Sequence, residues 1–177
     1  SMVYPVSCMG SHVSASPNHQ TNRVTPIETR ADVAYFGTFG YELDLLKLSE
    51  EEKAEVRRQI AFMKEKRELI QKGIFYRLKS PFEGNVTAWM IVSEDQKKAL
   101  VGYYRVMQPV NIGFVRLKLK GLKEDTCYKV SGYDYDCYGD ELMQVGMILS
   151  DSASGVWKKG VNDKGDFQAK VFEIVAV

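Results

Sequence analysis

The stretch of sequence that decides the fold is residues 9–45, "MGSHVSASPNHQTNRVTPIETRADVAYFGTFGYELDL". Residues 9–15 predict a short strand that leads into a polar loop. Thr25-Pro26-Ile27-Glu28 is typical of a helix start, because threonine can cap, proline fits the first helical position and glutamate can reach back to the cap. A helix is therefore predicted over residues 26–36. Beyond it, residues 38–45 predict a second short strand that is buried.

A second helix is predicted from Ser49 to residue 72. Ser49 can cap its first turn while the side chain of Glu52 reaches back, and Gly73 suits the position just after the last turn. Apolar side chains recur along this segment with the helical period, at Val56, Ile60, Met63 and Ile70. The order strand, helix, strand, helix predicts two consecutive βα units of the kind that build parallel sheets.

After Gly73 the apolar pattern changes to a period of two. Strands are predicted within residues 85–93, 98–107, 114–122, 127–133, 141–149 and 167–177. This spacing favours an antiparallel β-sandwich over residues 74–177, so the fold class is α/β followed by all-β, with a boundary after residue 73. The side chains expected inside the sandwich are Trp89, Ile91, Leu117, Leu119, Val145 and Phe172.

Composition and charge narrow the function classes. Hydrophobic residues make up 45% of the chain and charged residues 27%, which predicts a packed globular core. The 24 basic and 23 acidic residues leave a formal net charge of +1, so nucleic-acid binding is not expected. No apolar run reaches the roughly 18 residues of a membrane span. The odd number of cysteines (Cys8, Cys127 and Cys137), with no CxxC pair, favours free thiols and a cytoplasmic location.

Two polar clusters raise the question of a metal ion. His12 and His19 have no third ligand candidate nearby, so hydrogen bonding within a structured loop is favoured over metal binding. Asp134, Asp136 and Asp140 depart from the spacing of calcium-binding loops, which favours a polar hairpin turn. No metal and no cofactor is expected.

Aromatic side chains are frequent in the second half of the chain, at Trp89, Tyr103, Tyr104, Tyr128, Tyr133, Tyr135, Tyr138 and Trp157. Sugar rings stack on such side chains, but aromatic residues are also common in strands and cores. Packing is the favoured interpretation, and a sugar-binding platform is the alternative.

Residues 4–45 resemble the end of the catalytic barrel of glycoside hydrolase family 36, the bacterial α-galactosidases. The likeness continues in "YYRVMQPVN" (residues 103–111), "RLKLKGL" (residues 116–122) and "YGDELMQVG" (residues 138–146). The resemblance implies that residues 1–73 hold strands seven and eight of a (β/α)8 barrel with their helices, and that residues 74–177 form the C-terminal β domain.

The same resemblance implies a retaining hydrolysis of terminal α-galactosyl groups from melibiose, raffinose and related galactosides, by a homotetramer. Such a reaction needs a nucleophile and an acid/base carboxylate, which this family carries in "KWD"-type and "SDxTD"-type motifs. Neither motif occurs in the chain. We therefore expect a C-terminal fragment that has no catalytic residue and is inactive by itself. The alternative is a free-standing β-sandwich module that binds carbohydrate or protein.

Active sites of such barrels lie at the carboxyl ends of the strands. Asn18 and His19 follow the first predicted strand, and Asp44 follows the second. We expect these three residues at the rim of the α-galactoside pocket, the alternative being that they only maintain the geometry of their loops.

Overall fold

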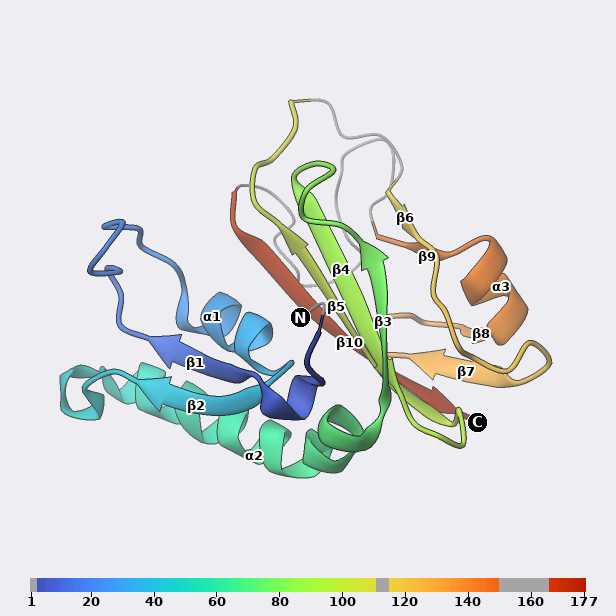
Figure 1. Ribbon diagram of the computed structural model, residues 1–177, viewed down its shortest axis with the longest axis horizontal. Helices are drawn as coiled ribbons and strands as arrows, with labels where there is room; N and C mark the ends of the chain where they lie inside the picture. Colours follow the sequence, from blue (N-terminus) through green and yellow to red (C-terminus); the bar gives the residue numbers. More distant parts are fainter. Residues whose placement is uncertain (1–2, 111–114, 150–165) are drawn as a thin grey trace. The chain divides into compact units, whose positions relative to one another are not determined.

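The chain folds into two compact units, Ser1–Lys72 and Gly73–Val177. The computed structural model describes residues 3–110, 115–149 and 166–177 (Figure 1). Trp157, one of the aromatic residues considered above, lies outside the described residues.

In the first unit, two parallel strands each lead into a helix. Its elements are η1 (Val6–Cys8), β1 (Gly10–Ser14), α1 (Ile27–Ala34), β2 (Thr38–Glu42), η2 (Leu45–Lys47) and α2 (Glu50–Lys72). The register of the pair runs from Gly10 opposite Thr38 to Ser14 opposite Glu42, and both arrows point the same way in Figure 1. The two predicted βα units are confirmed.

The start of α1 differs from the prediction. The helix begins at Ile27, and its N-cap residue is Pro26, which makes no capping hydrogen bond with its side chain. Thr25 therefore lies one residue too early to cap, and its carbonyl instead accepts a hydrogen bond from Arg30 Nε at 3.0 Å. The predicted capping box is wrong. The second strand is also shorter and less buried than predicted, because β2 ends at Glu42 and both of its end residues are exposed.

The start of α2 is as predicted. Ser49 Oγ accepts a hydrogen bond from Glu52 N at 3.2 Å, and Glu52 Oε2 accepts one from Ser49 N at 3.0 Å. Val56, Met63 and Ile70 are buried. The predicted stripe is wrong at one position, since Ile60 is 36% exposed whereas its neighbour Gln59 is 1% exposed. The buried face of α2 therefore includes the polar side chain of Gln59 in place of Ile60.

The second unit is built around a six-stranded antiparallel sheet. Its elements are β3 (Ile74–Lys79), β4 (Val86–Val92), β5 (Lys98–Arg105), β6 (Arg116–Leu117), β7 (Cys127–Val130), β8 (Asp136–Tyr138), α3 (Gly139–Gln144), β9 (Met147–Ile148) and β10 (Gln168–Ala176). The strand order is β3-β4-β5-β10-β7-β8, and every neighbouring pair is antiparallel. β6 and β9 form a separate two-stranded sheet.

The core of this unit lies between the large sheet and a smaller second layer. Met90 and Val101 of the large sheet share one apolar cluster with Leu117 of β6, Leu142 of α3 and Met147 of β9. The second layer therefore consists of the short strand pair β6–β9 and the helix α3, which is drawn beside β9 in Figure 1. The antiparallel β-sandwich is confirmed, with unequal layers.

Leu117, Leu119 and Phe172 are buried in the core cluster, as predicted. Ile91 is also buried but lies outside this cluster, which takes Ala88, Met90 and Val92 from β4, so the predicted inward face of β4 is wrong. Trp89 is only half-buried. Val145 is 46% exposed, so its prediction is wrong. The cause is local, because Val145 is the C-cap of α3 and not part of a strand.

Several predicted strands also differ. Residues 141–149 were expected to be one strand but divide between α3 and β9. Of the predicted strand 114–122 the structure describes residues 115–122, and among these only Arg116–Leu117 pairs as a strand. The expected hairpin turn at Asp134, Asp136 and Asp140 contains strand β8, whose Cys137 is buried. β3 was not predicted, because its alternation is weak: none of its side chains is fully buried.

Candidate functional site

The loop after β1 is organised by Asn18. Its Oδ1 atom accepts hydrogen bonds from the backbone N of Gln20 at 3.1 Å and of Thr21 at 3.0 Å, and from Thr21 Oγ1 at 3.1 Å. The Asn18 backbone closes the loop by donating to Arg23 O at 2.9 Å. The side chain of Asn18 thus maintains the loop, which leaves its oxygen less available to a ligand.

Arg30 fastens the same loop to the protein. From α1, its guanidinium donates to Thr25 O and Pro26 O at 3.0 and 3.4 Å, and also to Ser14 O at the end of β1. One side chain therefore joins both ends of the loop. Burial lowers the pKa of Arg30, while the nearby carboxylates of Glu52 and Glu28 oppose that shift, so the guanidinium stays charged and keeps its hydrogen bonds.

His19 and Asp44, the other two predicted rim residues, differ in their surroundings. His19 is exposed in this loop, and it makes no hydrogen bond or ion pair with any described residue. Asp44 follows β2; its Oδ1 accepts from Leu46 N at 3.0 Å and so caps η2, and its Oδ2 lies 3.7 Å from Lys47 Nζ. Both follow the carboxyl ends of the paired strands, at the end where (β/α)8 barrels hold their sites.

A further polar pair lies on the strands themselves. His12 Nδ1 of β1 is 3.8 Å from Glu42 Oε2 of β2. The strand register brings these two side chains together. His12 is opposite Gly40, and Glu42 is two residues further along β2, on the same face. The sequence interpretation favoured hydrogen bonding within a structured loop for His12, with metal binding as the alternative, and did not consider Glu42. The period-two alternation of residues 10, 12 and 14 could have indicated that His12 faces away from Val13.

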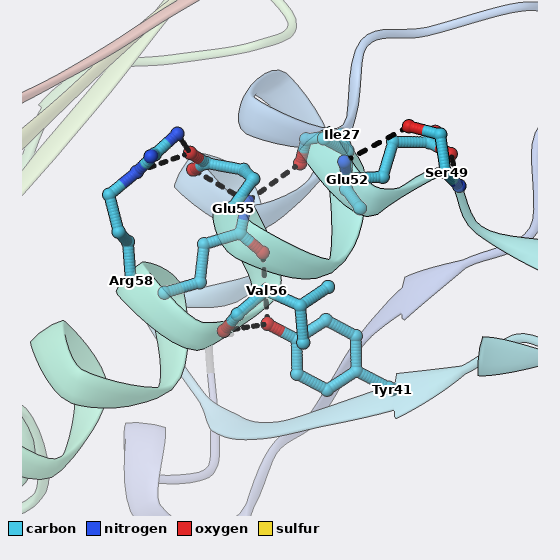
Figure 2. Close-up of polar contacts among 8 residues, drawn as sticks. Ile27, Tyr41, Ser49, Glu52, Glu55, Val56 and Arg58 are labelled. Carbon is cyan, nitrogen blue, oxygen red and sulfur yellow. Dashed lines mark hydrogen bonds and ion pairs between the residues drawn. The ribbon is translucent and has the colours of Figure 1, made fainter.

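The opposite face of the strand pair is joined to the helices by a buried polar network (Figure 2). Gln59 Oε1 accepts from Tyr41 OH at 2.9 Å, and Gln59 Nε2 donates to Glu55 Oε1 at 2.9 Å and to Ile27 O at 3.4 Å. Arg58 forms an ion pair with Glu55. The buried glutamine thereby has partners for both ends of its amide, as a buried polar group requires, and it connects α2 with α1 and β2.

Asp32 lies on α1 beside this network. Burial, followed by the charges of Glu55 and Glu28, raises the pKa of Asp32 from 3.8 to about 7. Burial also raises the pKa of Tyr41 to about 12, so its hydroxyl remains a donor. These groups lie on the helix side of the strands.

Within the described residues 3–110, 115–149 and 166–177, no three His, Cys, Asp or Glu side chains gather closely enough to hold a metal ion. Cys8, Cys127 and Cys137 are free thiols. Nor is any helix in those ranges long and apolar enough to cross a membrane.

Aromatic residues of the second unit mostly contact one another. Trp89 lies 4.6 Å from Tyr104 between ring centroids, and Tyr133 lies 5.4 Å from Tyr135 in an edge-on arrangement. Tyr133 OH also donates to Ile148 O at 2.6 Å. These contacts favour packing over a sugar-binding platform.

Two family models match the chain. The Melibiase model matches residues 1–73, and the model described as "Glycosyl hydrolase family 36 C-terminal domain" matches residues 86–174.

Individual relatives agree with these matches. The chain is 51% identical over 162 residues to α-galactosidase AgaA of Geobacillus stearothermophilus, which covers 89% of this chain and 22% of that protein. It is 41% identical over 177 residues to α-galactosidase Mel36A of Lactobacillus acidophilus, which covers 100% of this chain and 22% of that protein.

A crystal structure of Geobacillus AgaA superposes with a TM-score of 0.89 at 46% identity, over 99% of this chain and 23% of that one. The α-galactosidase of Lactobacillus brevis superposes with the same score at 40% identity, over 98% of this chain and 23% of that one.

The parallel βα units, the antiparallel β domain and these matches together define a segment of the glycoside hydrolase class. More narrowly, the chain belongs to glycoside hydrolase family 36. The expected family and the fold class, two barrel βα units followed by an antiparallel β domain, are therefore confirmed. The chain spans a little over a fifth of the length of the two α-galactosidases named above.

Proposed function

We propose that this chain is the C-terminal portion of a retaining α-galactosidase that hydrolyses terminal α-galactosyl groups of melibiose- and raffinose-type oligosaccharides. The observation that carries the proposal is the 51% identity with α-galactosidase AgaA over 162 residues. Variants of that Geobacillus protein have been crystallised in complex with raffinose and with stachyose, and this chain is 45% and 46% identical to them.

In this proposal residues 1–73 contribute strands seven and eight of the barrel, and residues 74–177 form the C-terminal domain. The β1–β2 pair supports this placement. Parallel sheets are normally larger than two strands and are covered on both faces, so such a pair is what a piece of a larger parallel sheet looks like. Asn18, His19 and Asp44 lie at the rim of the substrate pocket, where Asn18 and Asp44 maintain their loops and His19 is free to contact the sugar. The intact enzyme is a cytoplasmic homotetramer.

The chemistry itself comes from elsewhere in the intact protein. A retaining enzyme holds its two catalytic carboxyl groups about 5 Å apart. On β2 and beyond it, Glu42 lies 3.8 Å from His12 and Asp44 caps η2, and the proposal gives neither carboxylate the role of nucleophile. Because "KWD"-type and "SDxTD"-type motifs do not occur in the 177 residues, the isolated chain has no catalytic pair.

The test compares this chain with the product of its complete coding frame, using a nitrophenyl α-galactoside. The complete enzyme is expected to release nitrophenol and to lose that activity when the aspartate of either motif is replaced by asparagine. The 177-residue chain is expected to remain at the uncatalysed rate. Turnover by the 177 residues alone, or a complete frame without both motifs, would overturn the proposal and favour an independent module.

A further inference from the structure

The two faces of the β1–β2 pair have different surroundings. Tyr41 points toward α2, where its hydroxyl reaches Gln59 at 2.9 Å, and Phe39 stacks on Tyr35 at the end of α1 with 5.3 Å between ring centroids. Because side chains alternate along a strand, Gly40 and Glu42 point to the other face. The helices of a (β/α)8 barrel cover its outside, so the face away from them is the interior.

His12 is the largest side chain that the pair places on this inner face. Its ring lies over two glycines. A Cβ atom added at Gly40 would come within 3.2 Å of His12 Cδ2, and one added at Gly10 within 3.7 Å of His12 Cε1. The imidazole therefore lies against bare backbone of its own strand and of the neighbouring strand, in space that ordinary side chains would fill.

Glu42 lies on the Nδ1 side of this ring. Its Oε2 atom is 3.8 Å from His12 Nδ1, which is close enough for an electrostatic contact but too long for a direct hydrogen bond. His12 Nε2 then faces away from Glu42, and within residues 3–110, 115–149 and 166–177 it has no hydrogen-bond partner. Glu42 is the last residue of β2, so the pair lies at the carboxyl end of the strands, where barrel enzymes bind substrate.

We propose that His12 is a binding residue of the sugar pocket, whose Nε2 atom accepts a hydrogen bond from a hydroxyl group of the bound α-galactosyl ring. Glu42 acts through His12 as a positioning residue, and Gly10 and Gly40 provide the space that the ring occupies. This inference rests on the proposed α-galactosidase function and adds two residues to its site.

The experiment uses the intact enzyme and measures KM and kcat for nitrophenyl α-galactoside together with the inhibition constant of galactose. His12→Phe keeps a flat ring and removes the nitrogens. The loss of one neutral hydrogen bond predicts a rise of about 2- to 13-fold in both KM and the inhibition constant. His12→Gln retains a polar atom near the position of Nε2 and is expected to recover part of this loss.

Two further variants leave His12 in place and test whether the position of its ring affects binding. Gly40→Ala keeps His12 but pushes its ring, and it is expected to raise KM in the same direction. Glu42→Gln is expected to have a smaller effect that disappears in the His12→Phe background, because Glu42 acts only through the ring. Glu83→Gln, which changes an exposed carboxylate of the second unit in the same way, is the matched control and should leave KM unchanged.

The KM values of deoxygenated substrates distinguish direct binding by His12 from a purely structural role. Among nitrophenyl galactosides that lack one ring hydroxyl each, one is expected to have the same KM with wild-type and His12→Phe enzyme, and it identifies the hydroxyl bound. Equal losses for every substrate, or an unchanged KM in His12→Phe, would overturn the inference while leaving the proposed function intact. Absence of α-galactosidase activity in the wild-type enzyme would remove the proposed function, and this inference with it.

Discussion

Replacing Asp32 by asparagine is expected to stabilise the first unit at neutral pH. Burial, then Glu55 and Glu28, raises the pKa of Asp32 from 3.8 to about 7. Between these values the carboxyl is protonated in the folded chain but ionised in the unfolded chain, so stability falls as pH rises through this window and is constant above it. A shift of about 3 pKa units corresponds to roughly 4 kcal/mol. Asparagine carries no charge and avoids this loss.

The assay is hydrogen exchange of the backbone amides of α2 in the 177-residue chain, which reports the free energy of opening of the first unit. The advantage of Asp32→Asn over wild type should be about 1 kcal/mol at pH 4.5 and about 4 kcal/mol at pH 8. Glu94→Gln, an exposed carboxylate of the second unit, controls for the change of charge. An advantage that is the same at both pH values would refute the reasoning, because it would mean that Asp32 titrates as in the unfolded chain.

Three substitutions test the packing of the two units. Met63→Ala, at a position 5% exposed, should lower the stability of the first unit by about 2–5 kcal/mol, whereas Ile60→Ala should cost less than about 1 kcal/mol, as measured by the same exchange experiment; equal losses would contradict the observed face of α2. Tyr41→Phe should cost about 1 kcal/mol, because Gln59 Oε1 loses its donor; no measurable loss would contradict this. Gly139→Ala would place a Cβ atom 1.9 Å from Lys123 O and should lower the melting temperature of the second unit, while Gly84→Ala, with no atom within 4 Å, should not; a Gly139→Ala variant that melts like the wild type would rule out this close approach.

The elements of the first unit could be predicted largely from sequence, because their signals are local. The cap of α2 involves only Ser49 and Glu52, three residues apart. The burial of Gln59 could not be predicted from the helical period, since its partners are Tyr41 on β2 and the Ile27 carbonyl of α1. A helix period identifies an apolar face, but which side chain lies at its centre depends on the neighbour that packs there.

In the second unit the sequence predicted the long strands and β7, but it missed β3 and β8 and gave strands that are too long around β6 and β9. β4, β5 and β10 were predicted because seven to nine residues are enough to display an alternating pattern. α3 was missed because a six-residue helix shows less than two turns of periodicity. Its position depends on a close contact at Gly139, whose backbone N donates to Thr126 O at 3.0 Å, and a contact between distant residues leaves no mark in a local pattern.

The candidate site was predicted only as far as the loops, and the reason lies in the residues themselves. Asn18 and Asp44 attracted attention because polar residues after strands are common in barrel sites, yet both side chains are engaged by backbone N–H groups of their own loops. The sequence did not indicate a site on the inner face of the strand pair, because this face carries Gly10 and Gly40. Glycine lowers the stability of a strand and offers no side chain to pack, so a face that served only as core would carry valine or isoleucine at residues 10 and 40. The glycines make sense once the His12 ring is counted as the occupant of their space. The absence of side chains at these two positions leaves room for the imidazole beside Glu42, which is the arrangement on which the proposed binding role of His12 rests.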